Sequence, residues 1–210
     1  MSNPALLATQ NLCCTRNDRI LFENLMVSLE PGAMLLVEGP NGSGKTSLLR
    51  ILTGLRLPES GDVLWRGEPI SRLSGDYYEQ VNYVGHHDGV KNELSCLENL
   101  RLARAMGIPS SLDLEDVLNQ VNLYEYADTE VSSLSAGQKR RLALARLLAK
   151  QALLWILDEP FTSLDSTSMS LFSRLFEQHL ESDGLIVMTS HHEISLPQSK
   201  VTRLTLGSAS

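Results

Sequence analysis

One stretch of the chain has the residue types and the spacing of a phosphate-binding loop. It matches the pattern G-x-x-x-x-G-K-[ST] at every fixed position, and its residues are Gly39, Pro40, Asn41, Gly42, Ser43, Gly44, Lys45 and Thr46. Glycines let the backbone turn with its N–H groups pointing inward, where they can hold phosphate oxygens. The Lys45 ammonium can reach the β- and γ-phosphates, and the Thr46 hydroxyl can bind Mg²⁺. The loop predicts nucleotide binding; alone it fits a kinase, a GTPase or a transport ATPase, and the alternative is a turn that binds nothing.

Two carboxylates follow an apolar run further along the chain. Leu153–Leu157 is continuous and apolar, and Asp158 and Glu159 come directly after it. A buried strand that ends there brings both carboxylates to the edge of the sheet that carries the phosphate loop. Asp158 would then bind Mg²⁺ through water, and Glu159 would polarise an attacking water. The alternative is a strand followed by an acidic turn, but the phosphate loop upstream favours the catalytic interpretation.

A third stretch, Leu134–Gln138, lies one predicted helix before these carboxylates and reads LSAGQ. Taken alone it is a helix start with a serine cap. In this order with the other two motifs it resembles the signature of ATP-binding-cassette (ABC) ATPases, usually written LSGGQ, from which Ala136 departs. The stretch Ser163–Asp165 is similar to the D-loop of that family, and His191 is similar to its switch histidine.

This resemblance implies a fold, a cofactor set and an assembly. The fold would be α/β, a P-loop NTPase of the ABC nucleotide-binding type, in one domain over residues 1–210. It would carry an N-terminal antiparallel β subdomain and an inserted helical subdomain at about 88–150. The ligands would be ATP and Mg²⁺, with Glu159, His191 and Lys45 catalytic. Two copies would meet head to tail as a homodimer, so that Ser135 and Gly137 of one chain touch the γ-phosphate bound by the other.

Two positions depart from the family pattern. Arg16 stands where many ABC proteins stack an aromatic ring on adenine; a guanidinium can also stack on a base, and the alternative is a solvated surface arginine. His86 or His87 stands in place of the Q-loop glutamine. A neutral imidazole can accept a hydrogen bond from water but has no amide oxygen for the metal.

The departures themselves resemble one family of ABC ATP-binding subunits, the CcmA family of the cytochrome c maturation system. The stretches that carry this likeness are GHHDGVKNELSCLENL, EPFTSLD, LLRILTGL and GDVLWRG. The likeness implies haem export or release of a haem-loaded chaperone, with the chain peripheral on the cytoplasmic face of the bacterial inner membrane. Its partners would be integral membrane subunits similar to CcmB and CcmC. The alternatives are an ABC ATPase for another solute, a soluble mechanical ABC ATPase, and a small nucleotide kinase.

The elements that must position these residues alternate between strands and helices, which indicates an α/β fold. We predict strands at 33–38, 153–157, 185–189 and 201–206, the last at a sheet edge, and a hairpin at 62–70 around Arg66-Gly67. We predict helices at 47–55, 97–106, 112–123 and 137–150, with Ser110 or Ser111 capping the third.

Composition narrows the classes further. The chain has 210 residues, 42% of them apolar, and a net charge of −7, so it can bury a sizeable core and is a poor general binder of nucleic acid. Cys13, Cys14 and Cys96 show no metal spacing, and reduced thiols are expected. We predict neither a signal peptide nor a membrane span, since the most apolar stretch, 142–157, is interrupted by polar residues.

Overall fold

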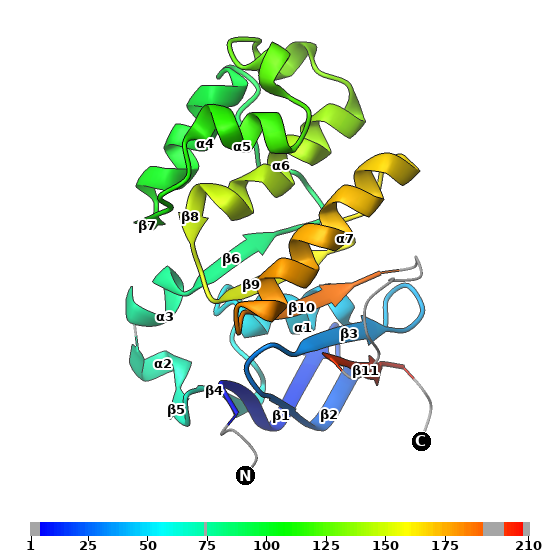
Figure 1. Ribbon diagram of the computed structural model, residues 1–210. Coiled ribbons are helices and arrows are strands. Elements are labelled where there is room, and N and C mark those ends of the chain that lie inside the picture. The colour runs from blue at the N-terminus through cyan, green and yellow to red at the C-terminus, as the bar shows by residue number, and fades with distance from the viewer. Residues whose placement is uncertain (1–4, 74, 191–199, 208–210) are drawn as a thin grey trace.

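Five parallel strands form a sheet through the middle of the molecule (Figure 1). Their order is β11 (Val201–Thr205), β3 (Met34–Glu38), β10 (Leu185–Thr189), β9 (Leu154–Asp158) and β6 (Val81–Val84). The computed structural model describes residues 5–73, 75–190 and 200–207. All four strands predicted for this sheet are confirmed, and β11 lies at its edge as predicted.

The central strands are continuous apolar runs because both of their faces are buried. Ile186 and Met188 of β10 belong to the core that holds the larger helices, whereas Leu185 and Val187 belong to a second core on the other face. The two faces alternate in the same way along β9 and β3. The sheet therefore separates two hydrophobic cores.

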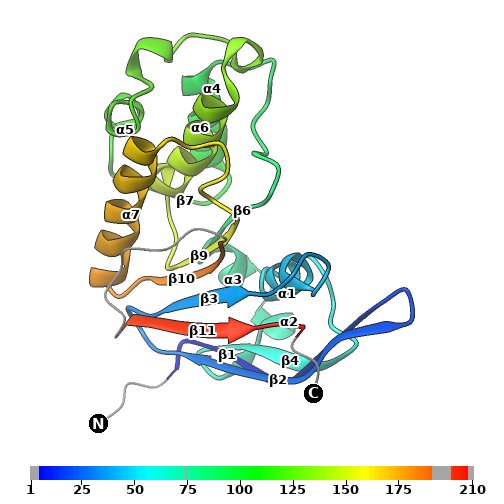
Figure 2. The same cartoon turned by 90° about the vertical axis from the view of Figure 1, so that its right-hand side faces the viewer.

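An antiparallel sheet covers the second core, and it lies below the parallel sheet in both views (Figures 1 and 2). Its order is β2 (Arg19–Leu29), β1 (Leu7–Arg16), β4 (Ser60–Trp65) and β5 (Glu68–Pro69). The predicted hairpin at Arg66-Gly67 is confirmed, since Trp65 pairs with Glu68. Both turn residues have positive φ, 52° and 84°, which is the turn type that matches strand twist.

Helix α1 (Lys45–Leu52) packs in the same core, under the phosphate loop. It begins two residues earlier than the predicted helix and stops before Gly54, whose φ of +73° ends it. Strand β6 and the long helix α7 (Ser166–Glu181) were not predicted from the sequence. Also not predicted were the short elements α2 (Ile70–Leu73), α3 (Gly75–Glu79), β7 (Ile108–Pro109), β8 (Lys150–Gln151) and the 3-10 turns Tyr124–Tyr126 and Val131–Ser133.

The remaining helices pack on the other face of the parallel sheet. They are α4 (Cys96–Ala105), α5 (Leu114–Gln120), α6 (Ala136–Ala149) and α7 (Ser166–Glu181); the first three stand above the sheet in Figures 1 and 2. The predicted cap of α5 is wrong: Asp113, not Ser110 or Ser111, accepts from the Glu115 N–H at 2.8 Å, because the helix begins two residues later than predicted. Among the described residues, no helix combines the length and hydropathy needed to cross a bilayer.

Candidate functional site

The phosphate loop connects the carboxyl end of β3 to the first turn of α1. Gly44 precedes the helix with a φ of +105°, and no side chain caps the helix start, so the first-turn N–H groups keep their capacity for an anion. Gly39 has a φ of +140°, and a Cβ there would lie 2.3 Å from the Leu206 carbonyl oxygen. At these two positions the path of the loop requires glycine.

Lys45 lies at the start of α1 and turns back over the loop. Its Nζ donates to the carbonyl oxygens of Gly39 at 2.6 Å and Pro40 at 3.2 Å. These bonds hold a nearly buried ammonium above the turn formed by the loop. A phosphate in the loop would meet that charge directly.

The hydroxyl of Thr46 and the carboxylate of Asp158 meet although they are 112 residues apart. Thr46 Oγ1 donates to Asp158 Oδ2 at 2.8 Å. The other carboxylate oxygen, Oδ1, accepts from Thr189 Oγ1 at 2.8 Å, and Asp158 is 3% exposed. A hydroxyl and a carboxylate at the edge of a phosphate loop are oxygen ligands of the kind that Mg²⁺ takes together with water and phosphate, so these residues fit the ion.

Glu159 follows Asp158 in a left-handed backbone conformation, with a φ of +50°. A non-glycine residue in this region persists only when its surroundings hold it there. The Thr189 hydroxyl accepts the Glu159 N–H at 2.8 Å. One threonine therefore bonds to both neighbours, the Asp158 side chain and the Glu159 backbone.

A cavity of about 160 Å³ lies over the loop. It is lined by Arg16, Leu21, Asn41, Gly42, Gly44, Lys45, Thr46, Ser47 and Glu159. The structure thus brings Arg16 of β1 and Glu159 of the β9 end to the phosphate loop. The roles assigned to these two side chains stay predictions.

Ser135 and Gly137 lie elsewhere, at the start of α6. Ser135 Oγ accepts from the Gln138 N–H at 3.3 Å, and Gln138 Oε1 accepts from the Ser135 N–H at 2.8 Å, a capping box. A Cβ on Gly137 would lie 2.9 Å from the Ser163 carbonyl oxygen, so the LSAGQ stretch adjoins the D-loop-like segment. Neither residue lines the phosphate cavity, and α6 packs in the core on the opposite face of the sheet from α1.

The loop that follows β6, residues 85–88, carries two histidines and is called the histidine loop below. His86 and His87 are exposed, and their rings meet edge to face at 5.7 Å. Arg140 of α6 holds the loop on either side of them, through the Gly85 carbonyl and the Asp88 carboxylate. Sequence reasoning missed Arg140 and Thr189. The predicted switch residue, His191, lies outside the described residues.

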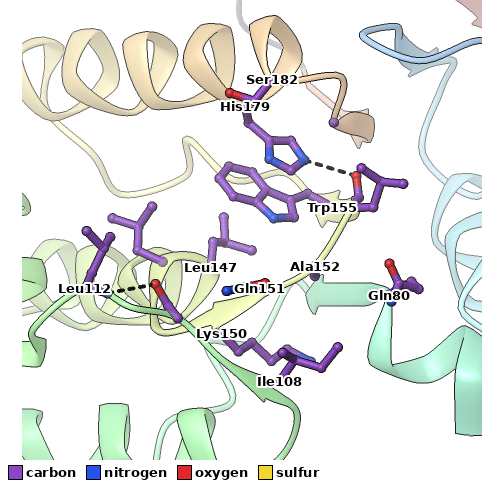
Figure 3. Close-up of a pocket in the computed structure, with 14 residues that line it drawn as sticks. Gln80, Ile108, Leu112, Leu147, Lys150, Gln151, Ala152, Trp155, His179 and Ser182 are labelled. Atoms are coloured by element: carbon purple, nitrogen blue, oxygen red, sulfur yellow. Dashed lines mark hydrogen bonds between the residues drawn. The ribbon is translucent and has the colours of Figure 1, made fainter.

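A larger cavity, of about 460 Å³, lies at the opposite edge of the sheet (Figure 3). Trp155 stacks on His179 there, with ring centroids 3.8 Å apart, and His179 Nε2 donates to the Leu153 carbonyl oxygen at 3.2 Å. Burial lowers the pKa of His179 to about 4, so the imidazole is neutral near pH 7. This cavity opens at the amino ends of β9 and β10, whereas the phosphate loop lies at the carboxyl ends.

The chain is similar in sequence to ATP-binding proteins of ABC transporters. A family model described as "ABC transporter" matches residues 22–162. "Cytochrome c biogenesis ATP-binding export protein CcmA" from Methylococcus capsulatus is 46% identical over 194 residues, covering 91% of this chain and 94% of that protein. The protein of the same name from Escherichia coli K12 is 39% identical over 201 residues and covers 96% of both chains.

Solved structures share the architecture. "Putative ABC transporter (ATP-binding protein)" from Pyrococcus furiosus superposes with a TM-score of 0.81 at 22% identity, over 95% of this chain and 96% of that one. "Structure of ATP binding subunit of ABC transporter" superposes with a TM-score of 0.85, also at 22% identity, over 96% and 85%. At this identity the likeness establishes the arrangement of the backbone alone.

Proposed function

Because the chain belongs to the ABC transporter family, and within it to the cytochrome c biogenesis ATP-binding export proteins CcmA, we propose that it hydrolyses ATP to drive an export step in cytochrome c biogenesis. The predicted fold class, an ABC-type P-loop NTPase, is confirmed. Membership of this family excludes the alternative that the chain is a small nucleotide kinase. The observation that carries the proposal is the meeting of Thr46 and Asp158 at the phosphate loop.

ATP phosphates would be held by the backbone N–H groups of the loop and by the Lys45 ammonium. Thr46 would bind Mg²⁺ directly and Asp158 would bind it through water, and the ion would neutralise charge on the β- and γ-phosphates. Arg16 would lie against the adenine. These residues come from three elements whose ends line one cavity.

Glu159 would act as the base that orients and polarises the attacking water. Its backbone is fixed at both ends of the residue: the N–H bonds to Thr189, and the carbonyl oxygen bonds to Arg140 at 2.7 Å. Fixed geometry of this kind matters because small displacements of a catalytic group are costly. His191 is proposed as the second catalytic group on the resemblance described above.

We further propose that the site is completed by a second copy of the chain. Ser135 and Gly137 would bring the first turn of α6, and the positive end of its dipole, to the γ-phosphate of the other subunit. Within one chain these residues lie away from the phosphate cavity, which supports a head-to-tail homodimer. ATP would join the two copies and hydrolysis would separate them.

Separation of the copies would move integral membrane partners similar to CcmB and CcmC, at the cytoplasmic face of the inner membrane, and the cargo would be haem or a haem-loaded chaperone. We also propose a single domain over residues 1–210, with the helices between about 88 and 150 as an inserted subdomain. Those helices stand together above the sheet (Figure 2), where a partner can reach them.

The test is the Lys45→Ala variant. Loss of the ammonium should reduce ATP turnover by about a hundredfold or more, because phosphate charge is then left without its partner. Turnover is measured as phosphate release by the full chain with its membrane partners, and Arg72→Lys, at an exposed residue of α2, serves as a control away from the loop. Full ATPase activity in Lys45→Ala would contradict the site, and normal c-type cytochromes in a deletion strain would contradict the export role.

A further inference from the structure

Arg140 is a charged residue in the second turn of α6, and it is buried, with 3% of its surface exposed. A guanidinium has five N–H bonds in a rigid, planar fork. Here all five are used. Three of them donate to the carbonyl oxygens of consecutive residues, Asp158 at 3.0 Å, Glu159 at 2.7 Å and Pro160 at 3.0 Å.

The other two N–H bonds point to the histidine loop. They come from one nitrogen, Nη1, which donates to the Gly85 carbonyl oxygen at 3.0 Å and to Asp88 Oδ1 at 3.1 Å. Asp88 is also the counter-ion of the buried charge, and its own side chain is 27% exposed. His86 and His87 lie between these two contacts. One rigid group therefore spans from the backbone of Glu159 to the loop that carries the histidines.

We propose that Arg140 is a positioning residue for Glu159, and that it makes the position of Glu159 depend on the histidine loop. The proposal rests on the proposed function, in which Glu159 is the base. Arg140 donates to the carbonyl oxygen of this left-handed residue at 2.7 Å, and Thr189 accepts a hydrogen bond from its N–H at 2.8 Å.

The geometry explains why a movement would be transmitted rather than absorbed. The fork is planar and conjugated, so its two ends cannot move independently. A partner that shifts residues 85–88 would pull Nη1 of Arg140, and Nη2 would carry that shift to the Glu159 carbonyl. The loop has no glutamine at this place. Through Arg140 it is nevertheless connected to the backbone of Glu159, the proposed catalytic base.

The decisive variant is Asp88→Ala, because it removes one contact of Arg140 without changing the fork or the residues of the phosphate cavity. We expect kcat to fall by about tenfold, since a small displacement of a catalytic group costs up to about a hundredfold. The dissociation constant for ATP should stay within about twofold of wild type, because the loop is intact. Asp88→Asn, which keeps an oxygen acceptor at the same place, should restore most of the rate.

Arg140→Lys is the second variant, since an ammonium keeps the charge but cannot reach both segments. Its kcat should be lower still, and adding Asp88→Ala should cost it little more, because the coupling is already lost. Arg104→Lys is the matched control. Arg104 also donates to two backbone carbonyls, of Ala149 and Leu112, but it touches neither segment held by Arg140.

A measurement on the nucleotide-free chain separates this proposal from the proposed function. Hydrogen–deuterium exchange at the amides of Asp158 and Glu159 should be faster in Asp88→Ala than in wild type and unchanged in Arg104→Lys. Unchanged exchange together with wild-type kcat in Asp88→Ala would overturn the proposal. So would equal losses of kcat, ATP affinity and melting temperature, which indicate a general loss of structure. A wild-type chain that hydrolyses no ATP while the exchange result holds would overturn the proposed function instead.

Discussion

At the scale of single residues, one side-chain oxygen, that of Thr189, contacts both acidic residues of the candidate site. Its hydroxyl donates to Asp158 and accepts from the Glu159 N–H, both at 2.8 Å, and the residue is fully buried. A buried polar group that loses its partner costs about 1–3 kcal/mol. The free energy of folding and the geometry of the two carboxylates therefore depend on the same oxygen.

Thr189→Val should lower the free energy of unfolding by about 1–3 kcal/mol, because the change leaves a carboxylate oxygen and an N–H without this partner at nearly constant volume. It should also lower kcat for ATP. Urea titration and phosphate release measure the two effects. Thr189→Ser keeps the hydroxyl and should stay near wild type; a Ser variant as impaired as the Val variant would point to packing of the methyl group instead.

His179 predicts a pH dependence of stability. Burial lowers its pKa from 6.5 to about 4, so the unfolded chain binds this proton more tightly than the folded one. The contribution is fully present above pH 6.5 and is lost as the pH falls toward 4; at its largest it amounts to about 3 kcal/mol.

The measurement is urea-induced unfolding at pH 7 and at pH 4.5, for wild type and for His179→Phe. Phenylalanine keeps a ring against Trp155 but has no proton to gain. We expect wild type to lose more stability between the two pH values than the variant does. Equal losses would show that the pH dependence arises from carboxylates elsewhere.

Sequence reasoning at this scale located residues where a side chain has a fixed place in a pattern, and the roles assigned to these residues stay predictions. The phosphate loop and the pair Asp158-Glu159 were found in this way. Arg140 and Thr189 were missed for one physical reason. Most of their partners are backbone atoms or residues distant in sequence, and the residue types of a sequence do not show which backbone carbonyls a side chain will contact. His86 and His87 were noticed as a departure, but the arginine that holds their loop was not.

At the scale of elements, α6 joins two tasks at its first turn. The Ser135 side chain caps the helix, and the same turn is proposed to face the γ-phosphate of a second copy. A cap is worth about 1 kcal/mol, while a phosphate contact depends on charge. Substitutions can separate these tasks.

Ser135→Ala should lower the free energy of unfolding by about 1 kcal/mol through loss of the cap. Ser135→Asp should keep that stability, since aspartate caps equally well, yet it should abolish ATP-dependent association because its charge repels phosphate. Thermal unfolding and light scattering with ATP give the two readouts. An Asp variant that still associates with ATP would contradict the role of Ser135 at the phosphate.

Element positions were predictable from hydrophobic period, and boundaries were less so. Four of the five strands of the parallel sheet were predicted because they are mostly apolar runs, as expected of strands buried between two cores. The fifth, β6, was missed because the buried polar residue Asn82 interrupts its run. The start of α5 was misplaced because three nearby polar residues, Ser110, Ser111 and Asp113, offer alternative caps. The short pair β7 and β8 has two residues in each strand, too few to show any period.

At the scale of the whole molecule, the proposed assembly gives a direct prediction. Glu159→Gln should bind ATP and fail to hydrolyse it, so the chain of 23.2 kDa should accumulate as a dimer when ATP and Mg²⁺ are present. Light scattering measures the mass. The double variant with Lys45→Ala should remain monomeric, and a Glu159→Gln chain that stays monomeric with ATP would contradict the head-to-tail pair.

The presence of a core on each face of the parallel sheet restricts the insertions and deletions that this chain can tolerate during evolution. Every residue of β9 from Leu154 to Leu157 is assigned by parity to one core or the other. A deletion of one codon inside this strand would exchange the two sets and turn Asp158 to the wrong face. Insertions and deletions among natural variants should therefore occur in loops outside the sheet. The number of residues in β9 should stay the same even where its side chains are substituted.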